Sequence, residues 1–349
     1  MSMVEEPNLL ITEAEIRDAL AEINRETLIA LDLEGVNLGR SGEITLIQIA
    51  INSTREVFLF DLVLAECNIF ECGLKDILEN VNIKKLMFDC RHDADALSKL
   101  YNIQLNSIID LQLLETTKLI NTNTAEEELD RLCGHLHRGN VKGTPPLYTN
   151  VHKLPSLQGI LETYNLGDAS IKATKLGCTT NSQFWKQRPL SVSAIKYAAQ
   201  DVHILFDAAI AIGSYTNIEQ IMSDTALLSA SECYANVFRS ATDLTYYEHG
   251  LLPLGILDNI YVSPTSMTHT RACICCHRNF LKSLYSRNAL NKGEPRCDVC
   301  RALHIQERTV QQWSNNERND EYYGSDSDDY GREYYGADDD DYYGGGYCS

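Results

Sequence analysis

Three apolar runs in the first part of the chain predict three consecutive strands. They are TLIALDLE, which ends in acidic residues, EITLIQIAI and REVFLFDL. Continuous apolar runs of this length, bounded by polar residues, are typical of buried strands. The connection GVNLGRSG between the first two has the Gly and Ser content of a turn. We therefore expect an antiparallel meander, preceded by a helix for which Thr12 and Glu15 form a capping box.

Strands and helices then alternate along the chain. Helices are predicted at 69–79 and 93–101, and the apolar runs KKLMFDC and SIIDLQ predict strands. This alternation favours parallel pairing, so the pattern as a whole indicates an α/β fold with a mixed sheet flanked by helices. Residues 139–155 contain three prolines and two glycines and predict a long surface loop. Further helices are expected at 157–164, 191–212 and 217–239.

Length and composition divide the chain into two folded pieces and a tail. A chain of 349 residues with 44% hydrophobic composition can form one large core and a smaller unit. We assign a large domain to residues 10–264, with its core at 25–215, and a small module to 268–305. Residues 314–349 are acidic, rich in Tyr and Gly and poor in aliphatic side chains, which predicts a disordered tail.

The compartment follows from two further features. The N-terminal residues do not form a basic stretch followed by an apolar run, and no window approaches the length of a membrane span. Twelve cysteines, several of them scattered singly, fit a reducing environment. We expect an intracellular protein, cytoplasmic or nuclear, that makes no contact with a membrane.

The net charge of the whole chain argues against a nucleic-acid partner. The net charge is −19, and residues 1–267 hold 20 basic and 35 acidic residues. Phosphate binding depends mainly on Lys and Arg, so this acidity opposes it. Residues 268–305, however, have seven basic and two acidic residues. The small module is therefore the basic part of the chain.

Two pairs of side chains suggest a shared chemical site. Asp32 and Glu34 are two residues apart on a predicted strand, so both leave the same face and can share one ion. Tyr197 and Asp201 are four apart on a predicted helix and lie on one side of it. Each pair has an ordinary alternative, a strand that ends in solvent or an exposed helical pair. Neither pair decides the function alone.

A third acidic group lies where a buried strand passes into a helix. The segment LMFDCRHDADALSKL contains Asp89, Asp93 and Asp95. Acids in the first turn of a helix interact favourably with its dipole whether or not they bind a ligand. The alternative of a purely structural role therefore stands for this group too.

Taken together and in this order, the motifs resemble the DEDDy class of 3′–5′ exonucleases, which includes RNase D, the Werner-type exonuclease domain and the Egalitarian-like proteins. LDLEG resembles the first motif of the family, FDCRHDADAL the second and YAAQDV the third. IDLQLLE, LPSLQGILETYNL and FWKQRPLS are supporting matches. The resemblance covers roughly residues 25–215.

The resemblance implies an RNase H-like fold and a 3′–5′ exonuclease that acts on RNA or DNA, with a single-stranded 3′ end as its substrate. It places the metal ligands at Asp32, Glu34, Asp93 and Asp201, with Asp95 as the alternative to Asp93. Tyr197 would help to orient the attacking water. The competing hypothesis is a scaffold of Egalitarian-like type that binds nucleic acid or protein with little or no turnover.

The chemistry of phosphodiester hydrolysis explains why such residues are needed. Two cations about 3.5–4 Å apart activate the water and stabilise the leaving oxygen. Mg²⁺ and Mn²⁺ prefer oxygen ligands, so four carboxylates suit two such ions. Lys186 and Arg188 precede the catalytic helix and are the preferred candidates for phosphate contacts, although solvated surface charge is the alternative. Other candidates are Lys84, Lys85, Arg91, Lys172 and Lys175.

The small module contains two C-x₂-C pairs with twenty residues between them. Cys273 and Cys276 form the first pair, and Cys297 and Cys300 the second. This spacing is typical of a zinc ribbon, in which four thiolates hold one structural Zn²⁺. Cys275 and His277 are not assigned as ligands, but exchange of a ligand for either of them stays an alternative. A thiol redox pair is the alternative to a zinc site. The module could hold nucleic acid through its basic and aromatic residues or dock a protein partner, and the acidic tail is a second possible protein-binding segment.

Overall fold

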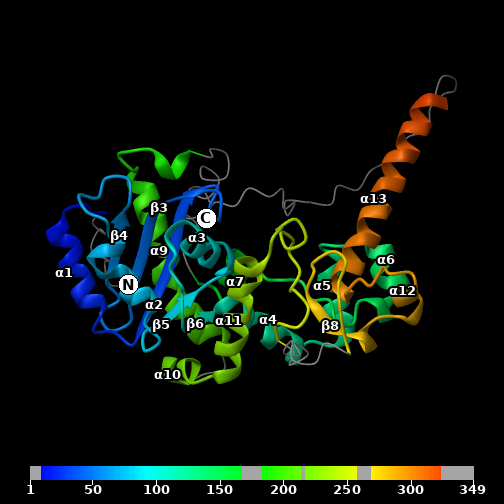
Figure 1. The fold of residues 1–349 in the computed structure, drawn as a ribbon, viewed down its shortest axis with the longest axis horizontal. Coiled ribbons are helices and arrows are strands. Elements are labelled where there is room, and N and C mark those ends of the chain that lie inside the picture. Colours follow the sequence, from blue (N-terminus) through cyan, green and yellow to red (C-terminus); the bar gives the residue numbers. More distant parts are fainter. Residues whose placement is uncertain (1–8, 167–182, 214–216, 258–268, 324–349) are drawn as a thin grey trace. The chain divides into compact units, whose positions relative to one another are not determined.

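The computed structural model describes residues 9–166, 183–213, 217–257 and 269–323 (Figure 1). These residues form two compact units. The first contains the described residues up to Thr122 together with Leu154–Tyr247, and the second contains Asn123–Lys153 together with the described residues from Glu248 on. The predicted division was linear along the chain. The structure instead assigns Asn123–Lys153, from the middle of the predicted large domain, to the unit that carries the cysteine pairs.

The first unit is built on a six-stranded mixed sheet with the order β1-β4-β3-β2-β5-β6. β2, β3 and β4 pair antiparallel, which confirms the predicted meander. The other neighbours, β1 with β4, β2 with β5 and β5 with β6, are parallel. The strands are β1 (Leu9–Leu10), β2 (Leu28–Val36), β3 (Glu43–Ile51), β4 (Val57–Asp61), β5 (Lys84–Met87) and β6 (Ile108–Asp110).

Helices cover this sheet, as the near-continuous burial of its strands requires. α9 packs against β2, β3, β4 and β5, and α11 packs against α3 and β6. The predicted capping box of Thr12 and Glu15 begins the first helix. The helices of this unit are α1 (Glu13–Ile23), a π-helix (Phe70–Leu74), α2 (Lys75–Glu79), α3 (Arg91–Tyr101), α4 (Leu111–Thr122), α7 (Leu157–Thr163), a 3₁₀ turn (Phe184–Lys186), α9 (Val192–Ile212), α10 (Ile218–Met222) and α11 (Thr225–Ser240).

The second unit combines a hairpin and a long helix with a helical segment from the middle of the chain. The predicted loop at 139–155 is wrong in part, because residues 138–143 form a helix. The predicted tail is also wrong at its start, because the last helix continues to Tyr323; residues 324–349 lie outside the described residues. The elements are α5 (Ala125–Cys133), α6 (Arg138–Gly143), a 3₁₀ turn (Pro145–Leu147), β7 (Thr270–Ala272), β8 (Asn279–Leu281), a 3₁₀ turn (Lys282–Leu284), α12 (Arg287–Asn291) and α13 (Asp298–Tyr323).

Polar contacts join α13 to the segment Asn123–Lys153. The Gln306 side chain accepts a hydrogen bond from the His137 backbone N–H at 2.7 Å. Asn140 donates to the Thr309 hydroxyl at 2.8 Å, and Asn150 donates to the Asp298 carboxylate at 2.8 Å. These contacts explain why the middle segment belongs to the second unit. No helix within the described ranges has both the length and the apolar content needed to cross a bilayer.

A buried ion pair ties the turn after β2 to two helices of the first unit. Both oxygens of Asp95 on α3 accept from the Arg40 guanidinium at 3.0 Å, and the Asp95 side chain is fully buried. The same guanidinium donates to the carbonyl oxygens of Phe238 at 2.6 Å and Ala241 at 2.8 Å. Arg40 therefore joins the turn, α3 and the C-terminal end of α11.

We predict that Arg40→Ala destabilises the first unit by about 3–5 kcal/mol, because it leaves the Asp95 charge buried without its partner. Arg17→Ala is the matched control, since Arg17 pairs with Glu13 on an exposed surface and its loss should have little effect. The free energy of unfolding is measured in urea by tryptophan fluorescence. In a Trp313→Phe background, Trp185 is the remaining tryptophan and reports on this unit. Equal effects of the two substitutions would contradict the prediction.

Candidate metal centres

Three of the four predicted acidic ligands converge in the first unit. Asp32 and Glu34 lie on β2 and Asp201 lies on α9. One carboxylate oxygen from each lies within 4.8 Å of the others. Asp32 and Asp201 are half-buried, and Glu34 is 1% exposed. Residues almost 170 positions apart in the sequence therefore form a group that is compact enough to hold a cation.

A bulge in β2 lies directly beside these acids. The register between β2 and β3 shifts between Glu34 and Gly35. A Cβ atom at Gly35 would lie 2.0 Å from the Glu43 carbonyl oxygen, so only glycine fits this position. Bulges bend a strand locally and redirect the side chains next to them. The glycine in LDLEG thus has a steric role in the shape of the site.

Asp93 lies near this group but outside the three residues that share the 4.8 Å limit. It is in the first turn of α3 and is 3% exposed. Burial raises the pKa of Asp93 well above its ordinary value, and the nearby charge of Asp32 raises it further. Asp32 and Asp93 therefore interact electrostatically.

The other acids of the same segment have structural partners. Asp95 is bound by Arg40, as described above, so its carboxylate already has a partner and is less suited than Asp93 to serve as a metal ligand. Burial raises the pKa of Asp89, but its ion pair with Arg91 at 2.6 Å outweighs burial and lowers the pKa overall. Asp95 is thus bound within the fold by Arg40, whereas the charge of Asp32 acts on Asp93.

Asp110 is a buried acid whose role the sequence did not reveal. Its carboxylate accepts hydrogen bonds from the backbone N–H groups of Cys90 and Gln112, both at 2.9 Å. It thereby fixes the start of α3 and the start of α4 at once. Burial raises the pKa of Asp110 to about 6. The only signal was its place in the supporting match IDLQLLE, which did not distinguish a structural residue from a ligand.

Tyr197 and Asp201 interact as their four-residue spacing predicted. The Tyr197 hydroxyl hydrogen-bonds the Asp201 carboxylate. Burial raises the pKa of Tyr197 far above its ordinary value, and the charges of Asp201, Glu34 and Asp32 raise it further. The phenol therefore keeps its proton and acts as a hydrogen-bond donor at this site, not as a base.

The two predicted phosphate contacts differ in their surroundings. Lys186 is about half exposed and forms a surface ion pair with Glu43 at 2.6 Å, which a phosphate could replace. Arg188 is held by the buried Asp61 carboxylate at 2.6 and 2.9 Å, and it also donates to backbone carbonyls. Its donors are directed to the protein, so the prediction that Arg188 binds phosphate is not supported by its surroundings.

The remaining basic candidates give little support for a phosphate surface. Lys85 is fully buried and donates to the Asn80 carbonyl, and Arg91 is buried against Asp89. Lys172 and Lys175 lie outside the described residues.

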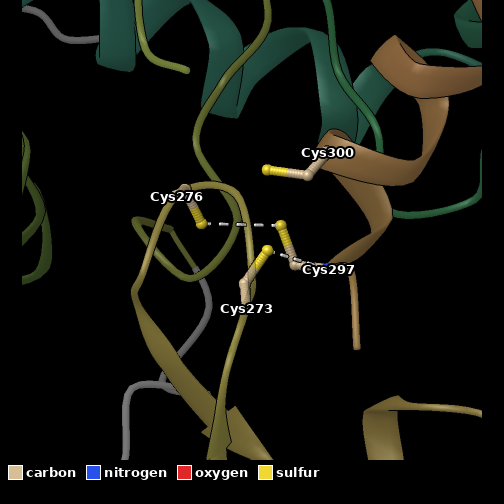
Figure 2. Close-up of side chains that lie close together, drawn as sticks. All are labelled: Cys273, Cys276, Cys297 and Cys300. Atoms are coloured by element: carbon tan, nitrogen blue, oxygen red, sulfur yellow. Dashed lines mark hydrogen bonds between the residues drawn. The ribbon is translucent and has the colours of Figure 1, made fainter. Parts of the chain in front are cut away.

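The four predicted zinc ligands also converge, in the second unit (Figure 2). The Sγ atoms of Cys273, Cys276, Cys297 and Cys300 lie within 4.8 Å of one another, and all four residues are buried. The first two lie in the turn between β7 and β8, and the others lie at the start of α13. Cys275 is buried but is not part of this group.

The geometry of the cysteine group fits a tetrahedral zinc ion. Zn–S bonds of about 2.3 Å place neighbouring sulfur atoms about 3.8 Å apart. The Sγ atoms of Cys276 and Cys297 are 3.9 Å apart. Hydrogen bonds from the other three thiols hold the pKa of Cys273 well below its ordinary value, whereas hydrogen bonds within the same cluster raise the pKa values of Cys297 and Cys300. Thiolate is the form that binds zinc.

Comparison with known proteins decides the family of the first unit. A family model described as 3′–5′ exonuclease matches residues 8–213. The chain belongs to the 3′–5′ exonuclease family. The matched range contains all four acidic residues and Tyr197, and the predicted RNase H-like exonuclease fold is confirmed.

Two individual proteins are similar in sequence to parts of this chain. The human piRNA biogenesis protein EXD1 is 28% identical over 224 residues, which covers 64% of this chain and 38% of that protein. An Egalitarian protein homolog of Caenorhabditis elegans is 34% identical over 86 residues, which covers 25% of this chain and 15% of that protein. This chain thus matches less than half the length of these two relatives.

A solved structure shows the same fold. The Trypanosoma brucei RNase D in complex with RNA U12 aligns with a TM-score of 0.54 and 19% identity, covering 73% of this chain and 79% of that one. The same enzyme in complex with GMP aligns with a TM-score of 0.52 and 20% identity, covering 71% of this chain and 70% of that one.

The first prediction from this site concerns the stability of the exonuclease unit without Mg²⁺ or Mn²⁺. Burial raises the pKa of Asp32 from its ordinary 3.8 to about 7. The folded chain therefore keeps a proton that the unfolded chain releases, and stability falls as the pH rises from about 4 to about 7. Asp32→Asn should remove this contribution, at about 1.4 kcal/mol per pKa unit. The substitution should stabilise the metal-free protein at pH 8 and have little effect at pH 4, as measured by urea unfolding. A stabilisation of the same size at both pH values would contradict burial of the Asp32 charge as the cause.

The second prediction concerns the cysteine group. Cys297→Ser should abolish binding of one equivalent of Zn²⁺ and unfold the second unit, because structural zinc supplies folding energy to modules of this size. Zinc content is measured by mass spectrometry, and unfolding by the appearance of protease cleavage sites within residues 123–153 and 269–323. Cys275→Ser is the matched control and should retain the metal. Retention of zinc by Cys297→Ser would exclude this residue as a ligand.

Proposed function

We propose that this chain is a metal-dependent 3′–5′ exonuclease that removes nucleotides from the 3′ end of a nucleic-acid strand by a two-metal mechanism. The observation that carries the proposal is the approach of Asp32, Glu34 and Asp201 to within 4.8 Å of one another in a member of the exonuclease family. A group of converging carboxylates is the arrangement expected for hard divalent cations.

The carboxylates divide into two overlapping sets. Asp32, Glu34 and Asp201 would hold one cation, and Asp32 with Asp93 would hold the second. This division is supported by the shared position of Asp32, whose charge acts on Asp93 across the site. When bound, the two cations lower the pKa of a water molecule and stabilise the leaving oxygen.

Tyr197 and Lys186 have separate roles in this proposal. Tyr197 keeps its proton and donates it to Asp201, so its oxygen would orient the attacking water by accepting a hydrogen bond and would leave proton removal to the metal site. Its hydrogen bond to Asp201 places the phenol at the site in advance. Lys186, at the 3₁₀ turn before α9, would exchange its exposed partner Glu43 for a substrate phosphate.

RNA is the preferred substrate class. The human relative is a piRNA biogenesis protein, and the solved RNase D structure with this fold contains an RNA strand. A single-stranded 3′ end suits the mechanism because the terminal nucleotide must leave its base pair to reach the carboxylates.

The zinc module would supply the positive charge that the exonuclease unit lacks. Arg271, Arg287 and Lys292 are exposed in this module and are suited to phosphate contacts. The hydrophobic residues Phe280 and Tyr285 are buried, so they support the module rather than stack on bases. Their burial counts against a direct part for these two aromatic residues in the expected binding of nucleic acid by the module.

A binding scaffold without turnover is the second candidate. The excess of acidic residues over basic ones in residues 1–267 favours it, because this acidity opposes strong binding of a phosphate backbone. A protein partner of the zinc module or of the acidic tail would then carry the function.

The deciding experiment is degradation of a 5′-labelled single-stranded RNA by the full chain in Mg²⁺ or Mn²⁺, with a DNA strand of the same sequence in parallel. We expect stepwise shortening from the 3′ end and a loss of more than about 100-fold in rate for Asp32→Ala and Asp201→Ala, since removal of even an outer support of a metal site costs about 10–100-fold. Asp207→Ala is the matched control, because Asp207 lies on the same helix with a half-exposed side chain that pairs with Arg55.

The outcomes separate the two candidates. Degradation that is lost with Asp201→Ala and kept with Asp207→Ala supports the exonuclease. Absence of any metal-dependent shortening by the parent chain would favour the scaffold.

A further inference from the structure

Gln48 is a buried amide that the fold leaves without a hydrogen-bond partner. It lies on β3 and is fully buried. Neither its Nε2 nor its Oε1 atom has a hydrogen-bond partner among the residues that the structure describes. A buried amide without partners lowers stability relative to an apolar side chain, so its presence calls for a reason outside packing.

The fold satisfies a comparable residue completely. Gln112 is also buried, and its Nε2 donates to the Pro155 carbonyl at 2.9 Å. Its Oε1 accepts from the Tyr234 hydroxyl at 2.7 Å. The contrast shows that this sheet and its helices can provide partners for a buried amide, and that they do not do so at Gln48.

The strand register places Gln48 beside the acidic site. It lies directly opposite Asp32 on β2, and paired residues of antiparallel strands point to the same face with Cβ atoms about 4.5–5.5 Å apart. On its other side, Gln48 pairs with Leu59 of β4. The polar neighbour of Gln48 across the sheet is therefore Asp32.

The rest of this face shows why an amide is unexpected at this position. The next residues of β3 on the same face, Leu46 and Ala50, are apolar and buried. α9, which carries Asp201, packs against β3. An apolar residue at position 48 would continue the same packing without an unsatisfied group.

We propose that Gln48 is a positioning residue of the metal site, whose Nε2 donates a hydrogen bond to the Asp32 carboxylate when Asp32 holds a cation. This hydrogen bond would fix the orientation of the carboxylate that both cations share. Groups that hydrogen-bond a metal ligand are required for its full affinity, and their loss typically weakens binding about 10–100-fold. The inference rests on the proposed two-metal function.

The test is the affinity of the zinc-loaded full chain for Mn²⁺, measured by the electron paramagnetic resonance signal of free Mn²⁺, together with the melting temperature in the absence of Mn²⁺. Gln48→Met removes the amide and keeps a side chain of similar length. We expect it to weaken Mn²⁺ binding about 10–100-fold and to leave the melting temperature of the Mn²⁺-free protein unchanged or higher. Gln112→Met is the control, and it should lower the melting temperature and change the Mn²⁺ affinity less than about twofold.

Each other outcome overturns the proposal in a distinguishable way. Gln48→Met with the parental Mn²⁺ affinity, while Asp201→Ala loses binding, overturns the role of Gln48 and leaves the proposed function in place. A fall in melting temperature as large as that of Gln112→Met, without a change in affinity, assigns Gln48 to the core. A parent chain that binds Mn²⁺ no better than Asp201→Ala overturns both this proposal and the proposed function.

Discussion

Repulsion among buried carboxylates is the constraint on which the first unit depends. Two unit charges 4 Å apart repel by about 4 kcal/mol at an effective dielectric constant near 20, and Asp32, Glu34 and Asp201 lie within 4.8 Å of one another. A flexible chain would separate them. The central position of β2 in the sheet and the length of α9 hold them in place, so the folded protein keeps an arrangement that is unfavourable until a cation is bound. Burial adds to this cost, because it raises the pKa of Asp32 to about 7.

Three other acids of the same unit are stabilised by ion pairs instead of by a cation. Asp61, Asp89 and Asp95 are each bound by an arginine, at 2.6, 2.6 and 3.0 Å. Arginine suits this task because its planar fork matches a carboxylate and stays charged. These three acids are thus neutralised by the protein, whereas Asp110 is held by backbone N–H groups. Asp93 lies in the same segment as Asp89 and Asp95, and the charge of Asp32 adds to burial in raising its pKa, which links it electrostatically to the candidate site.

The sequence predicted those features that depend on local periodicity or on close spacing. The strand runs, the shared face of Asp32 and Glu34, the pair of Tyr197 and Asp201 and the two C-x₂-C pairs all follow from the geometry of a single element or turn. Features that depend on contacts between distant segments could not be predicted in this way. The choice between Asp93 and Asp95 depends on Arg40, 55 residues from Asp95, and the burial of Arg188 depends on Asp61. The helix α6 and its place beside α13 depend on polar contacts such as His137 with Gln306, for which the local pattern of residues 139–155 carries no signal.

The two candidate metal centres differ in how a bound cation would affect folding. The cysteine site joins a hairpin turn to the start of α13 in a small unit, so the cation that binds there contributes to the stability of that unit. The acidic site is held by a six-stranded sheet, and its converging carboxylates repel one another, so a bound cation would relieve this repulsion. Soft thiolates select zinc and hard carboxylates select Mg²⁺ or Mn²⁺, so the ions are sorted by the chemistry of the ligands. Under the proposed function, the cysteine site would keep its ion for stability while the ions at the acidic site could exchange.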